Sequence, residues 1–305
     1  MDISLCICTF RRPDQLAELL RALPSQIPAD CQAEIIVVDN DPAASATAVL
    51  GAAVTAVAPW PLVARHVASP NIALARNAAV AAARGTWIAI IDDDELPDPD
   101  WLRGLLATAL AHQADAVFGP VYPRYPANVA AWIPASRYFE PAQRATGTVI
   151  DSRQAYSGNV LIRRASLTAI TGPFDPEFGV TGGSDTMLFW ELQQRGARLV
   201  WCAEAIARET VPASRLTLRW ILRRAYRGGQ SFVRAEVARL TGPQRLGRAL
   251  QLGSQAMVRL PVALLLAVVQ APVSRARAAR WLWTAAAQVG KLTALVGHRY
   301  REYAH

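Results

Sequence analysis

The stretch WIAIIDDDELPDPDW, residues 87–101, joins an apolar run directly to a cluster of acids. Its first five residues are apolar, which is typical of a buried strand, and three aspartates and a glutamate follow directly. Carboxylates packed side by side repel one another and raise one another's pKa unless a cation or strong hydrogen-bond donors neutralise them. The stretch therefore predicts a strand end that meets a positive group.

Further strands and helices are predicted before this stretch. Residues 3–9 and 34–39 are short apolar runs that indicate buried parallel strands. Between them, residues 13–23 place leucines at helical spacing behind Pro13, which suits the first turn of a helix. Residues 71–84 predict an alanine-rich helix that begins after Asn71 as its N-cap.

The alternation continues after residue 97 with a predicted helix at 98–112 and strands at 114–120 and 198–202. Repeated alternation predicts an α/β fold, a mostly parallel sheet flanked by helices. In such sheets ligands bind at the carboxyl edge, where Thr9, Asp39 and Asp92 end three predicted strands. Residues 120–155 lack clear periodicity and are interpreted as a long functional loop or a small insertion.

Charge divides the chain into two predicted domains, 1–212 and 213–305. The first holds 16 basic and 22 acidic side chains, and the second holds 16 basic and two acidic ones. A basic tail of this kind predicts an anionic partner, either a membrane surface or nucleic acid. Four cysteines without zinc-like spacing argue against a metal site built on sulfur.

The tail is predicted to be helical throughout. Residues 216–240 predict an amphipathic helix broken at Gly228-Gly229, and residues 260–273 and 281–297 predict two short apolar helices flanked by Arg and Trp. These two helices are shorter than an ordinary membrane span of about twenty residues, so they are interpreted as interfacial anchors. Arginines that alternate with aliphatic runs favour a membrane over nucleic acid. The N-terminus lacks the features of a secretory signal, which predicts a cytosolic body.

Asp92 and Asp94 are separated by one residue at a strand end, so their side chains are expected to project together and that of Asp93 away. Oxygen ligands in this D-x-D pattern suit Mg²⁺ or Mn²⁺, which bridge carboxylates to phosphate oxygens. The alternative is that the acids cap the following helix and are solvated.

The chain contains a set of six short motifs in order: CTFRRP (8–13), VVDND (37–41), NIALARN (71–77), IIDDDELP (90–97), SGN (157–159) and GGSDTMLFWELQQRG (182–196). Together these motifs resemble those of family 2 glycosyltransferases of GT-A fold, a Rossmann-like sheet flanked by helices. Residues 37–42 and 209–220 are further similar to enzymes of bacterial exopolysaccharide assembly of the succinoglycan type.

The resemblance implies an inverting, metal-dependent transfer of one sugar from a nucleotide-sugar, with UDP favoured by family habit. Asp94 becomes the metal ligand. The implied nucleotide and donor residues are Thr9, Arg11, Asp39, Arg76, Asp92 and Asp93. For Asp39 the alternative is a loop-capping role, and for Arg76 it is an exposed helix charge.

Asp185 is the expected general base, because displacement of a nucleoside diphosphate requires removal of the acceptor hydroxyl's proton. Gly158, Asn159, Gly183 and Ser184 are expected at the donor-sugar or acceptor pocket, although a plain turn is a close alternative for the first two.

The chain departs from the family pattern at two places. Ser184-Asp185 stands where the family usually has Glu-Asp, and Glu209 stands where a histidine often binds the metal or phosphate. Glu209 is therefore a candidate metal ligand. Its added negative charge requires compensation, for which Arg215, Arg219 and Arg223 are candidates beside the diphosphate.

The expected acceptor is a lipid-linked saccharide or another polysaccharide precursor, and the expected location is the cytoplasmic face of the cell membrane. Two alternatives remain. One is a catalytically degenerate, membrane-binding protein with a sugar-nucleotide fold. The other is a sugar nucleotidyltransferase, which would need a glycine-rich phosphate loop that residues 8–15 lack.

Overall fold

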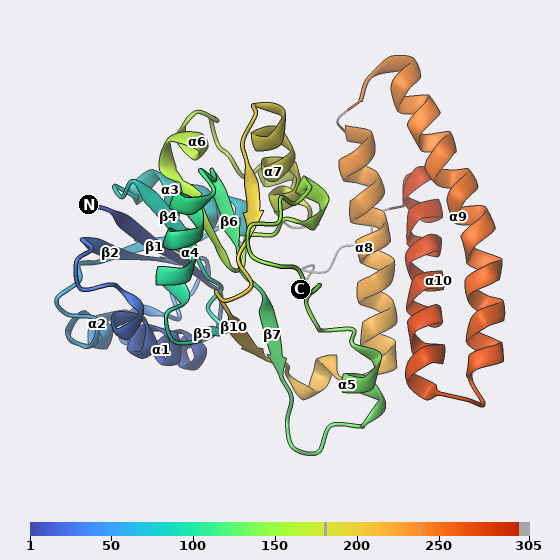
Figure 1. The fold of residues 1–305 in the computed structure, drawn as a ribbon, viewed down its shortest axis with the longest axis horizontal. Coiled ribbons are helices and arrows are strands. Elements are labelled where there is room, and N and C mark those ends of the chain that lie inside the picture. The colour runs from blue at the N-terminus through green and yellow to red at the C-terminus, as the bar shows by residue number, and fades with distance from the viewer. Residues whose placement is uncertain (180–181, 239, 299–305) are drawn as a thin grey trace. The chain divides into compact units, whose positions relative to one another are not determined.

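The computed structural model describes residues 1–179, 182–238 and 240–298, and it forms two compact units (Figure 1). The sheet unit consists of Met1–Pro123 and Pro141–Thr210. The helical unit consists of Arg124–Glu140 and the chain from Val211 onward.

A seven-stranded sheet with the order β3-β2-β1-β4-β8-β6-β9 forms the centre of the sheet unit. All neighbouring strands are parallel except that β8 runs antiparallel to both β4 and β6. The predicted mostly parallel α/β sheet is confirmed. The strands are β1 Ile3–Thr9, β2 Ala33–Asp39, β3 Leu62–His66, β4 Trp87–Ile90, β6 Ala116–Phe118, β8 Val160–Arg163 and β9 Leu199–Trp201.

Helices cover both faces of this sheet. One buried apolar cluster includes side chains of α1, α2 and α4, and the other includes side chains of α3, α6 and α7. The helices are α1 Pro13–Ala22, α2 Thr47–Ala56, α3 Ile72–Ala82, α4 Trp101–Ala111, α6 Arg164–Thr168 and α7 Ser184–Gln194, with short 3₁₀ turns η1 Leu23–Gln26, η2 Ser152–Gln154 and η3 Pro176–Phe178.

Local sequence signals explain where the first helices begin. Pro13 occupies the first turn of α1, and Leu16, Leu19 and Leu20 bury its inner face. The Asn71 side chain accepts hydrogen bonds from the backbone N–H groups of Ala73 and Leu74, so the predicted cap of α3 is confirmed.

A second sheet of three strands was not predicted. Its order is β5-β10-β7, with β5 Glu95–Pro97, β10 Ala207–Thr210 and β7 Val121–Arg124. The strands have three or four residues each, too few to show a period. The antiparallel pairing of β5 with β10 places Glu95 opposite Glu209, which brings together acids that are far apart in the chain.

The helical unit contains α5 Trp132–Ser136, η4 Ala213–Arg215, α8 Leu218–Ala238, α9 Gly242–Gln270 and α10 Arg275–Leu295. Helix α10 packs against both α8 and α9. The segment predicted as a loop or insertion supplies β7 and α5, and part of it joins this unit: the Tyr138 ring lies 4.8 Å from that of Trp283, and Phe139 stacks on Trp220.

Two sequence predictions for the tail are wrong. Helix α8 continues through Gly228-Gly229. Glycine at position 229 allows α10 to pack closely, since a Cβ there would lie 2.1 Å from the Ala287 carbonyl oxygen. The apolar run 260–273 is not a separate short helix, since α9 is one helix of 29 residues that contains Pro261.

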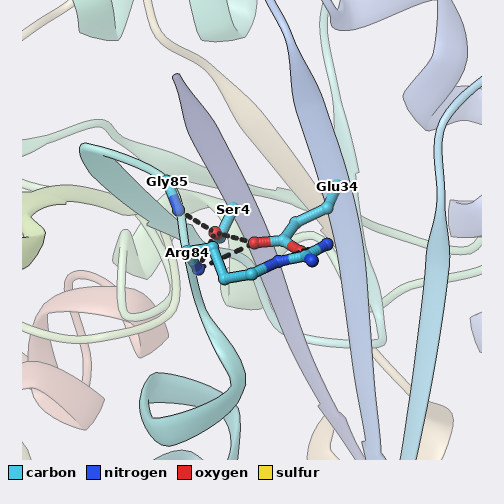
Figure 2. A network of polar contacts seen from close by, with 4 residues as sticks. All are labelled: Ser4, Glu34, Arg84 and Gly85. Carbon is cyan, nitrogen blue, oxygen red and sulfur yellow. Dashed lines mark hydrogen bonds and ion pairs between the residues drawn. The ribbon is translucent and has the colours of Figure 1, made fainter. Parts of the chain in front are cut away.

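An ion pair between the buried Glu34 and the exposed Arg84 joins the amino ends of β1 and β2 to the loop before β4 (Figure 2). Glu34 is completely buried and accepts hydrogen bonds from the Ser4 hydroxyl and from the backbone and guanidinium of Arg84. Ser4 Oγ in turn accepts from the Gly85 backbone N–H. Burial alone raises the pKa of Glu34, but these hydrogen bonds outweigh it and hold that pKa below its ordinary value.

Replacing Glu34 should destabilise the protein, because the buried Ser4 hydroxyl and the backbone N–H of Arg84 would lose their shared acceptor. We expect Glu34→Ala to lower the free energy of unfolding by about 2 kcal/mol, measured by urea unfolding with tryptophan fluorescence. Because the pKa of Glu34 is depressed, its contribution is present at neutral pH and is lost as the pH falls through the folded-state value. The exposed Glu18→Ala variant should unfold like the parent, and equal stability of the two variants would contradict this role.

Candidate functional site

The candidate site lies at the carboxyl edge of the large sheet, where three neighbouring parallel strands end. Thr9 pairs with Asp39 at the ends of β1 and β2. Strand β4 ends at Ile90 beside β1, and the acidic run follows it. The parallel order β2-β1-β4 therefore brings the predicted edge residues to one place, as the sequence indicated.

Asp93 is the buried member of the acidic run. The Thr9 hydroxyl donates to one of its oxygens at 2.7 Å, and the Arg12 guanidinium donates to the other at 2.8 Å. Asp93 thus points away from solvent, although it lies in a turn and not on the strand. Burial raises its pKa to about 6, despite the opposing effects of Arg12 and Thr9. The polar groups of Thr9 and Asp93 satisfy one another.

Arg12 also contacts Asp94 at 2.7 Å, so one guanidinium joins two neighbouring carboxylates. Burial lowers the pKa of Arg12, but Asp93 and Asp94 raise it to a net increase, which keeps the guanidinium charged. Arg12 is the positive group whose presence the acidic run predicted.

Arg76 on α3 is the second cation of the site. Its guanidinium lies 3.3 Å from an Asp92 oxygen and over the ring of Phe174, and its side chain is only 11% exposed. Burial lowers its pKa, but Asp92 and Asp185 raise it, so Arg76 interacts with acids from two separate motifs. The alternative of an exposed helix charge does not hold. Among the described residues, Arg76 Nε has no hydrogen-bond partner, so it can donate to a further acceptor.

Glu95 is an acid of the site that sequence reasoning did not assign. It is buried on β5, and its Oε2 has no hydrogen-bond partner within the described parts of the chain. Burial raises its pKa well above the ordinary value, and its neighbours Asp92, Asp94 and Glu209 raise it further. We name these four residues the carboxylate cluster.

Gly158 packs against this cluster. A Cβ at this position would lie 2.8 Å from Glu95 Oε1 and 3.2 Å from Asp92 Oδ2, so only glycine leaves these carboxylates in place. Asn159 is completely buried instead: it accepts from Trp101 Nε1 and donates to the carbonyl oxygens of Pro120 and Ala205. Its amide ties strands and loops together, and only Gly158 of this pair adjoins the acids.

The donor set of the carboxylate cluster suits a hard divalent cation. Over residues 1–179, 182–238 and 240–298, no three His, Cys, Asp or Glu side chains are already arranged as ligands of one metal ion. Asp94 is ion-paired with Arg12, while Glu95 supplies a buried oxygen without a partner. Mg²⁺ and Mn²⁺ prefer carboxylate oxygens, so the chemistry of these side chains suits such an ion, although their arrangement does not form its ligand set.

Asp39 caps the loop that follows its strand. Its two carboxylate oxygens accept from the backbone N–H groups of Asp41 and Ala46, which is the alternative role considered for it. Each oxygen retains a further lone pair, so these bonds do not prevent contact with a ligand. Arg11 is 65% exposed and donates to Asp41, with a left-handed backbone at φ 57° that turns it away from Arg12's acids.

Asp185 lies in the first turn of α7, with Gly183 as the N-cap. Its Oδ1 accepts from the Thr186 backbone N–H. Gly183 has φ 112°, which favours glycine, and Ser184 is buried. Asp185 is therefore not the N-cap of α7.

Arg215, Arg219 and Arg223 belong to the helical unit, on η4 and α8. Arg219 and Arg223 are exposed, and Arg215 lies over the Trp220 ring. Their contact with a diphosphate remains a prediction.

Sequence reasoning missed Arg12 and Glu95. Both were in quoted motifs, next to residues that were chosen. Their neighbours Arg11 and Asp94 have the same chemical character, so residue type could not decide between them. The left-handed backbone at Arg11 determines which of the two arginines contacts the acids, and the pairing of β5 with β10 places Glu95 opposite Glu209.

Comparison with known proteins identifies what the chain resembles. Residues 4–170 match the family model for glycosyl transferase family 2. The chain is 33% identical over 233 residues to the succinoglycan biosynthesis protein ExoM of Rhizobium meliloti, covering 76% of this chain and 74% of ExoM. It is 30% identical over 174 residues to a pre-mycofactocin glycosyltransferase of Mycobacterium tuberculosis, covering 54% of this chain and 35% of that protein.

Solved structures share the fold at low sequence identity. The mannosyltransferase PcManGT from Pyrobaculum calidifontis, in complex with GDP-Man and Mn²⁺, has a TM-score of 0.63 at 20% identity, covering 95% of this chain and 86% of that chain. S. aureus TarS has a TM-score of 0.55 at 15% identity, and this chain spans 56% of its length. The GT-A fold is confirmed.

The raised pKa of Asp93 predicts a pH dependence of stability. Folding raises the pKa of Asp93 from 3.8 to about 6, so the folded protein binds this proton more tightly than the unfolded chain does. The stability of the folded protein therefore falls as the pH rises through that interval. We therefore expect the free energy of unfolding of Asp93→Asn, relative to the parent, to increase by about 2 to 3 kcal/mol between pH 4 and pH 7. Urea unfolding in EDTA measures it. A difference between Asp93→Asn and the parent that stays constant from pH 4 to pH 7 would contradict the prediction.

Proposed function

We propose, from the premise that the chain belongs to glycosyl transferase family 2, that it is an inverting, metal-dependent enzyme that transfers one sugar from a nucleotide-sugar. The acceptor is a hydroxyl of a lipid-linked saccharide or another polysaccharide precursor. The observation that carries the proposal is that Arg76 interacts with both Asp92 and Asp185, which joins the expected donor-binding acid to the expected base.

The chemistry requires a base and a means of stabilising the leaving group. Asp185 takes the proton from the acceptor hydroxyl, whose oxygen then bonds to the anomeric carbon. The bond from that carbon to the phosphate oxygen breaks, and the nucleoside diphosphate leaves with the bonding electrons. Attack from the face opposite the leaving group inverts the anomeric centre.

Two groups of the sheet unit serve the leaving group. When bound, a divalent cation supplies positive charge that stabilises the departing diphosphate, and Asp94, with Glu209 and the buried oxygen of Glu95, would hold it. Arg76 donates through its unpartnered Nε to an acceptor in the same place. Arg215, Arg219 and Arg223 are proposed as further diphosphate contacts.

The donor is proposed to be a UDP-sugar held by Asp39, Arg76 and Asp92, with Thr9, Arg11 and Asp93 shaping the same edge. PcManGT carries GDP-Man, and a further structure, of TarS 1–349, carries UDP-GlcNAc, so both nucleotides are compatible with the fold. Gly158, Gly183 and Ser184 are proposed beside the sugar or the acceptor.

A lipid-linked acceptor and transfer at the cytoplasmic face of the cell membrane are proposed from two features. ExoM is named for succinoglycan biosynthesis. The basic C-terminal part of this chain suits an anionic membrane surface.

Nucleotide binding tests the donor site. We expect one of UDP, GDP and dTDP to bind in the presence of Mn²⁺, as measured by calorimetry. This binding should be lost in EDTA. In Asp94→Ala the affinity should fall at least tenfold, or about 1.4 kcal/mol. The exposed Asp14→Ala variant serves as the matched control. Metal-independent binding that survives Asp94→Ala would exclude Asp94 as the ligand.

Replacing the base tests the mechanism separately. Asp185→Asn keeps the side-chain shape and the oxygen that accepts from Thr186, but it cannot take a proton. We expect kcat to fall on the order of 10³-fold with an unchanged nucleotide Kd. Glu191→Gln on the same helix should keep the parent rate. Turnover near the parent level in Asp185→Asn would remove Asp185 as the base.

A further inference from the structure

Helix α9 carries most of the exposed large apolar side chains of the described chain. Sixteen such side chains are exposed, and ten of them lie between Leu246 and Val273. They are Leu246, Leu250, Met257, Val258, Val262, Leu264, Leu265, Val268, Val269 and Val273. Scattered exposed apolar residues are ordinary, but a continuous apolar helix face indicates a binding surface.

Helix α9 buries small side chains and exposes large apolar ones, whereas a helix at a protein surface in water normally buries its large apolar side chains. Its buried stripe is made mainly of small side chains, with Ala256, Ala263 and Ala267 beside Leu252. Helix α10, its main neighbour, lies alongside it (Figure 1). Small residues permit close packing on that side, while the large ones face outward. We name the outward residues 257, 258, 262, 264, 265, 268 and 269 the outer face of α9.

The charges around this face have one sign. The sequence has no Asp or Glu from residue 237 to residue 301. Val273, at the end of the apolar run, is followed by three exposed arginines, Arg275, Arg277 and Arg280. An apolar surface bordered by arginines fits a layer of acyl chains bordered by anionic headgroups.

We infer that the outer face of α9 inserts into the surface of a membrane that contains anionic lipids, with the helix lying in the membrane plane. The inference rests on the proposed function, and it adds which helix of the chain contacts the membrane. A second copy of this chain would bring two acid-free, basic surfaces together, and the like charges would repel. A nucleic acid would meet the arginines but leave the apolar face in water.

An in-plane position follows from the two sides of the helix. By length and composition α9 could cross a membrane. However, Arg245, Arg248 and Gln251 occupy its first part, Arg248 pairs with Glu236 of α8, and a stripe along its length is buried. Spanning would draw these charged groups into the hydrocarbon layer. Insertion of one face leaves them at the surface.

The structure also places the contact differently from the sequence prediction, which included the helix at 281–297. Helix α10 packs against both α8 and α9, and Trp281 and Trp283 on it are half-buried. The Trp283 ring contacts Tyr138. These tryptophans belong to the packing of the helical unit, and the exposed apolar surface is on α9.

Co-sedimentation of the full chain with vesicles tests the inference. The vesicles contain phosphatidylglycerol and phosphatidylcholine in equal parts, or phosphatidylcholine alone. The parent should bind the anionic vesicles and bind the neutral ones more weakly. The triple variant Leu265→Ser, Val268→Ser, Val269→Ser should lose about tenfold or more of this binding. In the double variant Arg277→Gln, Arg280→Gln, binding to anionic vesicles should fall roughly fivefold for each arginine replaced. The remaining binding should depend less on salt.

Matched controls come from the sheet unit. Val54 and Leu110 are exposed to a similar degree, so the double variant Val54→Ser, Leu110→Ser should bind vesicles like the parent. Nucleotide binding is measured on every variant by calorimetry. An unchanged Kd shows that the protein is folded, and it separates the two proposals. Absent nucleotide binding in the parent would count against the donor site while the vesicle result still stands.

Three outcomes would overturn the inference. The first is a triple variant that sediments with anionic vesicles as the parent does. The second is a Val54→Ser, Leu110→Ser control that loses as much vesicle binding as the triple variant does. The third is a parent that forms dimers in analytical ultracentrifugation, becomes monomeric in the triple variant and does not bind vesicles, which would make α9 a contact between copies.

Discussion

Carboxylates that follow neighbouring buried strands repel one another, and the carboxyl edge of this sheet depends on how that repulsion is balanced. Arg12 joins Asp93 to Asp94, while Arg76 pairs with Asp92 and has its pKa raised by the charge of the acid at the start of α7. The balance is incomplete, since burial raises the pKa of Asp93 to about 6 and raises that of Glu95 well above its ordinary value. An edge that remains rich in negative charge has a reason to bind a cation and a polyphosphate together.

The opposite edge of the same sheet shows how a similar charge is neutralised for stability alone. Glu34 is as buried as any acid of the site, yet Ser4, Arg84 and backbone N–H groups satisfy its oxygens. Its pKa is lowered, whereas that of Glu95 is raised. Two buried glutamates in one sheet unit thus differ in the direction of their pKa shifts. The difference is in keeping with a structural role for Glu34 and with the proposed site at the carboxyl edge.

The helical unit solves a different packing problem. Gly229 and Gly290 let the backbones of α8 and α10 touch, and alanines serve the same purpose along α9. Small residues on the inside leave the large apolar ones for the outside. The unit therefore presents an apolar face that water alone does not favour. This is the face that we propose inserts into a membrane surface.

The sequence by itself determined the α/β class, the main parallel strands, the helices at 13–22 and 72–82, and the gathering of Thr9, Asp39 and Asp92 at one edge. These follow from apolar runs, helical spacing and caps, which are local signals. Only the tertiary structure decided that Arg12 and not Arg11 meets the acids, that Glu95 faces Glu209, and that Asn159 is a buried tie. It also decided that α8 is unbroken and that α9 exposes its large residues. Each of these outcomes depends on a partner distant in the chain, or on which side of a helix another helix covers, and neither is encoded in the spacing of nearby residues.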